Sequence, residues 1–85
     1  MYFSTRGIVF RQTRYSDTSL VVKILTEEAG LQSFMIKGAS RPKAKIRTSL
    51  FQPLTLLDLV VSHKDNSDLQ HLREAKVAYV YTTIY

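Results

Sequence analysis

The 85-residue chain contains no cysteine, which excludes a disulfide scaffold, a thiol nucleophile and a zinc site built on cysteine. It has no apolar run close to the ~20 residues that span a bilayer, so we expect no membrane segment. Its N-terminus, MYFSTRG, lacks the apolar core of a signal peptide. A chain of this length suits one domain. These absences predict a single small domain that works in the cytoplasm.

The motifs of common catalytic sites are also missing. The chain has no G-x-x-x-x-G-K-[ST] phosphate loop, no G-x-G-x-x-G dinucleotide motif and no H-E-x-x-H zinc motif. Its two histidines, His63 and His71, would bind a metal only with a third ligand. Asp65 or Asp68 would have to supply it, and we interpret all of these as polar hairpin residues instead. We therefore expect a protein that is not an enzyme and binds neither a metal nor a cofactor.

Positive charge, by contrast, is concentrated in one short segment. The chain has 12 Lys and Arg against 7 Asp and Glu. The sequence KGASRPKAKIR, residues 37–47, holds five of these cations and no acid, so the remainder of the chain is electrically balanced. Such a patch favours a polyanion partner, most often nucleic acid. A solvated loop that keeps the protein soluble is the alternative. The five basic residues are Lys37, Arg41, Lys43, Lys45 and Arg47.

Period-two alternation and β-branched residues predict five short strands. Gly30 is expected to take a positive φ in the tight second connection. The third strand cannot continue through Pro42, because proline cannot donate to a strand ladder. A short helical turn is predicted at 48–51. A helix is the alternative for the fifth segment, LQHLREAK, which has good helix formers. The predicted strands span 5–15, 19–27, 31–37, 54–63 and 69–76.

The alternation also assigns a core side to the first three strands. We expect Ile8 and Phe10 to face inward from the first strand, and Phe34 and Ile36 from the third. The inward residues of the second strand are Leu20, Val22 and Ile24. Four apolar residues fall on the opposite faces and together could form a docking surface for another protein. They are Val9, Val21, Leu25 and Met35.

Five consecutive strands with one longer, basic connection between the third and fourth predict an all-β chain. They match the OB-fold, a small, partly open, five-stranded barrel. An SH3-like barrel is the alternative, but it does not readily explain an interruption at that position. The predicted domain covers residues 1–76. Residues 77–85, VAYVYTTIY, are apolar and lack a polar end, so we expect them to begin a linker or helix toward a further, helical region. An edge strand or docking strand is the alternative.

Five short motifs occur in a characteristic order along the chain. They are RGIV at 6–9, YSDTS at 15–19, TEEAG at 26–30, KGASR at 37–41 and FQP at 51–53. Together they resemble the N-terminal domain of the RecO family of recombination mediators. Within the motifs, Asp17 stands where that family usually has Glu, and Ser40 replaces an arginine.

The resemblance implies a non-enzymatic OB-fold domain that binds single- and double-stranded DNA. Proteins of this family anneal complementary single strands and, with RecR, help to load RecA onto strands coated by single-strand-binding protein. Their C-terminal part is helical, often carries a zinc site and receives the tail of single-strand-binding protein. The resemblance therefore implies a bacterial DNA repair and recombination role at the nucleoid, with RecR and single-strand-binding protein as partners.

We expect the five cations of residues 37–47 to contact phosphates, which would give affinity without sequence preference. Arg41 is the foremost candidate, because a guanidinium matches phosphate oxygens and stacks on bases. Arg11, Arg14 and Lys23 are possible secondary contacts. Two alternatives stay open. The first is an interaction module that docks a helical region or RecR, and the second is an RNA-binding OB domain, which the sequence does not separate from a DNA-binding one.

Overall fold

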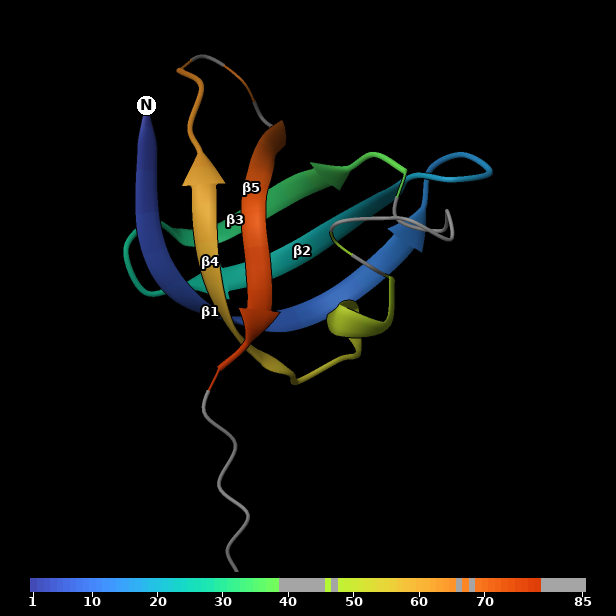
Figure 1. Ribbon diagram of the computed structural model, residues 1–85, viewed down its shortest axis with the longest axis horizontal. Coiled ribbons are helices and arrows are strands. Elements are labelled where there is room, and N and C mark those ends of the chain that lie inside the picture. Colours follow the sequence, from blue (N-terminus) through green and yellow to red (C-terminus); the bar gives the residue numbers. More distant parts are fainter. Residues whose placement is uncertain (39–45, 47, 66, 68, 79–85) are drawn as a thin grey trace, which may run out of the picture.

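The computed structural model of the chain describes residues 1–38, 46, 48–65, 67 and 69–78. Five strands and one short 3-10 helix make up this part, and Figure 1 colours them in chain order from blue to red. No helix among these residues is long and apolar enough to cross a membrane. The elements are β1 (Tyr2–Arg14), β2 (Leu20–Thr26), β3 (Gly30–Ile36), η1 (Thr48–Phe51), β4 (Leu56–Ser62) and β5 (Leu69–Val77).

The strands close into a barrel in the order β1-β2-β3-β5-β4, and β4 pairs back onto β1. Neighbouring strands are antiparallel except β3 and β5, which run parallel over the pairs from Ser33 with Leu69 to Met35 with His71. The predicted all-β OB-fold is confirmed, although the barrel is closed rather than partly open. Closure pairs each strand with two neighbours, which removes the exposed edges through which small sheets aggregate.

Strand β1 takes part in two ladders because it bends. Its residues 2–8 pair with β4 and its residues 7–14 pair with β2. The register with β2 shifts between Val9 and Arg11, so Phe10 has no residue opposite it. A bulge of this kind bends a strand and increases its twist, which allows β1 to reach both neighbours and close the barrel.

The prediction that Ile8 and Phe10 face the core is wrong. Ile8 is 39% exposed and Phe10 is 55% exposed, whereas Val9 between them is fully buried. Val9 therefore does not belong to an exposed docking surface. The pattern misleads because the apolar residues of this stretch alternate on the outer face of β1, and the bulge at Phe10 then shifts the alternation.

Two of the inward positions of β1 hold residues that are not typical of a hydrophobic core. Thr5 and Gly7 are both buried, although neither has a large apolar side chain. A Cβ at Gly7 would lie 2.5 Å from Cγ2 of Ile24, so only glycine fits where β1 approaches β2. Close strand contact decides the residue at Gly7. At Thr5 the hydroxyl oxygen accepts from the Glu28 backbone N–H at 3.1 Å.

The other assigned core residues are confirmed: all five predicted on β2 and β3 are buried. The 3-10 helix η1 lies at the predicted helical turn, and its Phe51 is fully buried against the barrel. Gln12 of β1 donates from Nε2 to the Phe51 carbonyl oxygen at 2.9 Å, which holds η1 to the barrel. The buried cluster consists of Val9, Leu20, Val22, Ile24, Phe34, Ile36, Phe51, Leu57, Leu59 and Val61.

The connections account for the remaining differences in strand bounds. Gly30 has the expected positive φ of 71°. Strand β4 begins two residues later than predicted, because Leu54 takes a φ of 68° in a turn before it. The fifth segment is strand β5, so the helix alternative is wrong. Ala78 still donates its backbone N–H to the Leu56 carbonyl oxygen at 2.9 Å. Residues 79–85 lie outside the described residues, so the expected linker or helix remains a prediction.

Candidate nucleic-acid interface

A groove of about 700 Å³ opens where three connections of the barrel meet. Strands β1 and β3 end on the same side of the molecule, and the β1–β2 turn projects there (Figure 1). The loop between β4 and β5 forms the other wall. The lining comes from the β1–β2 turn (Tyr15, Thr18, Ser19), the end of β3 (Met35, Lys37, Gly38), the β4–β5 loop (Lys64, Ser67) and β5 (Leu69, His71).

Lys37, the first of the predicted contacts, lies at this groove. It follows the last residue of β3 and is exposed. The next residue, Gly38, has a φ of 72°, so the chain turns sharply as it leaves the strand. Lys37 also lines a smaller hollow of about 260 Å³ together with Ile46 and Arg73. Of the other described residues of the basic segment, Gly38 lines the groove, and Ile46 lines the adjoining hollow and packs partly buried against the core.

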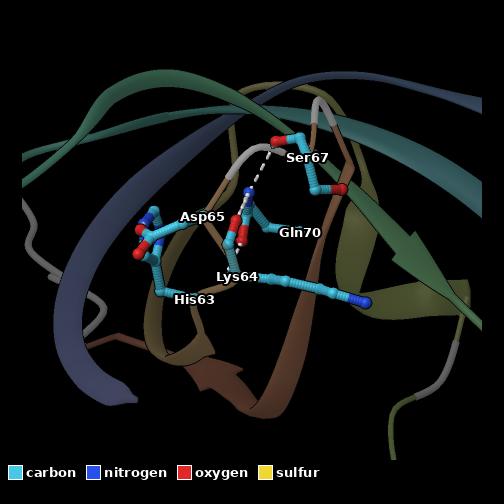
Figure 2. Close-up of polar contacts among 5 residues, drawn as sticks. All are labelled: His63, Lys64, Asp65, Ser67 and Gln70. Atoms are coloured by element: carbon cyan, nitrogen blue, oxygen red, sulfur yellow. Dashed lines mark hydrogen bonds and ion pairs between the residues drawn. The ribbon is translucent and has the colours of Figure 1, made fainter.

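The second cation of the groove is Lys64, in the loop between β4 and β5, a residue that the sequence does not single out. A buried amide holds this residue in place: Gln70 is only 3% exposed. Its Oε1 accepts from the Lys64 backbone N–H at 2.6 Å, and its Nε2 donates to the Lys64 and Ser67 carbonyl oxygens at 3.0 and 2.8 Å. Figure 2 shows the Gln70 amide between these two residues, with the Lys64 side chain pointing away from His63 and Asp65.

The remaining walls combine an aromatic ring, hydroxyl groups and apolar side chains. Tyr15 is 67% exposed, and its turn is held by two bonds from the N–H groups of Tyr15 and Ser16 to the Ser19 carbonyl oxygen, at 2.9 and 3.3 Å. The half-buried side chains of Met35 and Leu69 form the apolar part of the lining. Among the described residues, those that line the groove include no acid. Two cations over apolar and hydroxyl groups suit a ligand that carries both negative charge and flat apolar surface.

Comparison with known proteins places the chain in a family. Residues 1–81 match the family described as Recombination protein O N terminal. The chain belongs to this family. Among its relatives, the DNA repair protein RecO of Christiangramia forsetii is 34% identical over 86 residues, aligned with 100% of this chain and 36% of its own length. The protein of the same name from Phocaeicola vulgatus is 36% identical over 84 residues, 99% of this chain and 35% of its own length.

A third relative, the DNA repair protein RecO of Chlorobium phaeobacteroides, is 37% identical over 79 residues, 93% of this chain and 30% of its own length. The chain therefore spans about a third of the length of the curated relatives it matches. The resemblance noted in the sequence motifs is confirmed at the level of the RecO N-terminal family.

Of the five basic residues predicted from the charge of residues 37–47, only Lys37 falls within the described residues. The other four, Arg41, Lys43, Lys45 and Arg47, lie outside them and stay predictions. Two of the expected secondary contacts do come together: Arg11 and Lys23 are directly opposite each other on β1 and β2. They line a shallow hollow of about 280 Å³ on the outer face of the barrel.

The histidines do not assemble a metal site in the part of the chain that the structure describes. His63 Nε2 lies 3.0 Å from Asp65 Oδ1, and His71 is paired with Ser62. Asp68, the other ligand considered, lies outside the described residues. Among the residues described, no group of three His, Cys, Asp or Glu side chains is placed to hold a metal ion.

The predicted docking surface also needs correction. Val9 is in the core, and Met35 lines the groove instead. Leu25 is 46% exposed as expected, but its apolar neighbours are Ile8, directly opposite it on β1, and Leu56, opposite Ile8 on β4. These three line an apolar hollow of about 370 Å³.

Proposed function

We propose that this domain is a non-enzymatic DNA-binding module that serves recombination and repair, and that the groove between the β1–β2 turn and the β4–β5 loop is its binding site. The observation that supports the proposal is that Lys37 and Lys64 line one groove whose described lining holds no acid. Cations placed in this way neutralise phosphates and release counterions, which gives affinity without sequence preference.

The basic segment is part of the proposed site. Its described residues line the groove (Lys37, Gly38) and the adjoining hollow (Lys37, Ile46), and phosphate contacts from its other four cations belong to the proposal. If the five predicted cations all contact phosphates, the log–log slope of affinity against salt would be roughly −3.5 for single-stranded DNA.

Membership of the RecO N-terminal family supports the wider role. Three relatives carry the name DNA repair protein RecO. On this basis the domain contributes to annealing of complementary strands and, with RecR, to loading of RecA onto DNA coated by single-strand-binding protein in the bacterial nucleoid. A backbone binder suits annealing, because the bases must stay free to pair.

Fluorescence anisotropy of a labelled single-stranded oligonucleotide, titrated at several salt concentrations, tests the site. Lys37→Glu should weaken binding strongly, whereas the matched reversal Lys76→Glu, on the outer face of β5 away from the groove, should change it little. Circular dichroism checks that both variants fold. A folded wild-type domain that does not bind at low salt would contradict the proposal. An RNA oligonucleotide of the same sequence, bound more tightly than the DNA, would favour the RNA-binding alternative.

A second candidate function is docking of the further region that the longer relatives possess. The apolar hollow of Ile8, Leu25 and Leu56 supports it, since exposed apolar side chains gather there on three adjacent strands. Leu25→Ser should then weaken association with the remainder of a full-length relative, added as a separate chain, and leave DNA affinity unchanged. Unchanged association would exclude this surface.

A further inference from the structure

The outer face of β3 leads away from the groove. Residues 33, 35 and 37 all point outward, because Phe34 and Ile36 between them are buried in the core. The face therefore presents Ser33, Met35 and Lys37 in line, at a spacing of roughly 7 Å from one to the next.

The neighbouring strands extend this line into two rows across the barrel. The first row joins Thr13, Val21, Met35 and His71, which are paired in turn from β1 to β5. The second row lies two residues nearer the start of β3. It joins Arg11, Lys23 and Ser33 in the same way. The row continues to Leu69 on β5, which lines the groove with Lys64, so the two cations lie at the end of the row away from the groove.

The placement of Arg11 opposite Lys23 is unfavourable in the free domain. Like charges directly opposite each other on antiparallel strands repel and destabilise the sheet. Both side chains are exposed, and neither lies within ion-pair distance of an acid among the described residues. A bound anion between them would offset this repulsion, and the hydroxyl groups of Thr13 and Ser33 line the same hollow.

Between the two pairs of cations lies an apolar strip. Val21 and Met35 are half-buried neighbours on β2 and β3, directly opposite each other. A ligand that leaves the groove along the outer face of β3 therefore meets cations at both ends and apolar surface in the middle. An extended single strand has this pattern, because its phosphates carry charge while its unpaired bases offer flat apolar faces. A duplex keeps its bases inside.

We propose that a single-stranded nucleic acid leaves the groove along the outer face of β3, with bases on the Val21–Met35 strip and a phosphate held between Arg11 and Lys23. This assignment rests on the proposed function, and it adds a second phosphate anchor and a preference for single strands over duplex.

Paired neutralisations test the second anchor. Arg11→Gln/Lys23→Gln removes the two cations, and Arg6→Gln/Lys76→Gln removes the same charge from the outer face of β1 and β5 on the far side. If the anchor makes two phosphate contacts, the first variant should make the salt slope shallower by about 1.4 and weaken single-strand binding by about 25-fold at 0.1 M salt. The second variant should keep the wild-type slope.

The stability of the free domain provides a readout that a purely structural role would not give. Because the like charges repel, Arg11→Gln/Lys23→Gln should unfold at an equal or higher urea concentration than the wild type, although it binds DNA less well. Equal losses of affinity in both double variants would show a general charge effect and overturn the anchor. A lower urea midpoint for the first variant would also overturn it, since the pair would then support the fold.

Two further ligands separate this inference from the proposed function. A duplex should bind more weakly than the single strand, and its affinity should not depend on Arg11 and Lys23. An oligonucleotide of the same length with abasic positions should lose affinity; equal affinity would refute the base contact with the strip. If the wild type and Arg11→Gln/Lys23→Gln bind the single strand equally well, the anchor at Arg11 and Lys23 is refuted, but the proposed binding site in the groove is not. If wild type binds nothing, both proposals fail.

Discussion

The buried amide of Gln70 is the structural element on which the groove depends most, and Gln70→Met tests it. Methionine has a similar length and fills an apolar space well, so the change removes hydrogen bonds with little loss of volume. Three bonds to the backbone of Lys64 and Ser67 disappear. A typical bond contributes about 1 kcal/mol net, and a loosened loop lets water replace part of the loss. We expect the free energy of unfolding to fall by about 2 kcal/mol.

A second effect concerns Lys64 itself. Once its peptide group is released, the side chain no longer has a fixed position in the groove, and one phosphate contact should be lost. The salt slope for single-stranded DNA should then become shallower by about 0.7. In the double variant Lys64→Ala/Gln70→Met, the slope should equal that of Lys64→Ala alone, because Gln70 acts on the ligand only through Lys64.

Urea unfolding followed by circular dichroism measures the first effect, and anisotropy titrations measure the second. Gln32→Met is the matched control: the exposed Gln32 amide makes one bond, from Nε2 to the Ala29 carbonyl oxygen at 3.1 Å, and its loss should cost much less. If the two methionine variants are equally stable, Gln70 does not hold the loop. If the changes in salt slope caused by Lys64→Ala and by Gln70→Met add up in the double variant, Gln70 affects ligand binding by another route than Lys64.

Three substitutions test the fold around the site by urea unfolding. Gly7→Ala places a Cβ against Ile24 and should cost about 1–3 kcal/mol; a cost near zero would show that β1 and β2 separate readily. Gly30→Ala should cost about 1 kcal/mol, because φ at this turn is 71° while the space around it is open, and an unchanged midpoint would argue against that turn. Glu27→Gln removes the exposed ion pair with Arg6, at 3.6 Å, and should change stability by less than about 1 kcal/mol, with the difference fading in high salt; a large, salt-independent loss would contradict this.

The sequence predicts the barrel well where each strand has one clearly apolar face. On β2 and β3 the inward positions hold Val, Leu, Ile and Phe, and alternation identifies them correctly. On β1 the rule fails, because Gly7 occupies an inward position where the strands approach closely, and Thr5 occupies one where its hydroxyl accepts from the Glu28 backbone N–H. Phe10 then occupies a bulge that no period-two pattern reveals. Both features are consequences of closing the barrel, and closure depends on pairings between residues far apart in the chain.

The candidate site is partly predictable for the same reason. Lys37 belongs to a dense basic segment, and local composition is enough to single it out. Lys64 is a lone cation in a polar turn, and only the parallel pairing of β3 with β5 brings its loop opposite Lys37. Gln70 is a good helix former in a segment with a helical alternative. Its importance follows from the inward direction that strand β5 gives it, which buries its amide under the loop.

The two faces of β3 explain how a small domain combines a stable core with a binding surface. Phe34 and Ile36 point inward and hold the barrel together, while Met35 and Lys37 point outward to the groove. Because successive residues of a strand alternate between faces, the pattern that builds the core also sets the outward residues in line. A slip of one residue would bury Lys37 and expose Phe34, so the apolar side chains of the core also fix the register of the binding surface. Substitutions at outward positions should therefore change binding with little effect on stability, and substitutions at inward positions should do the reverse.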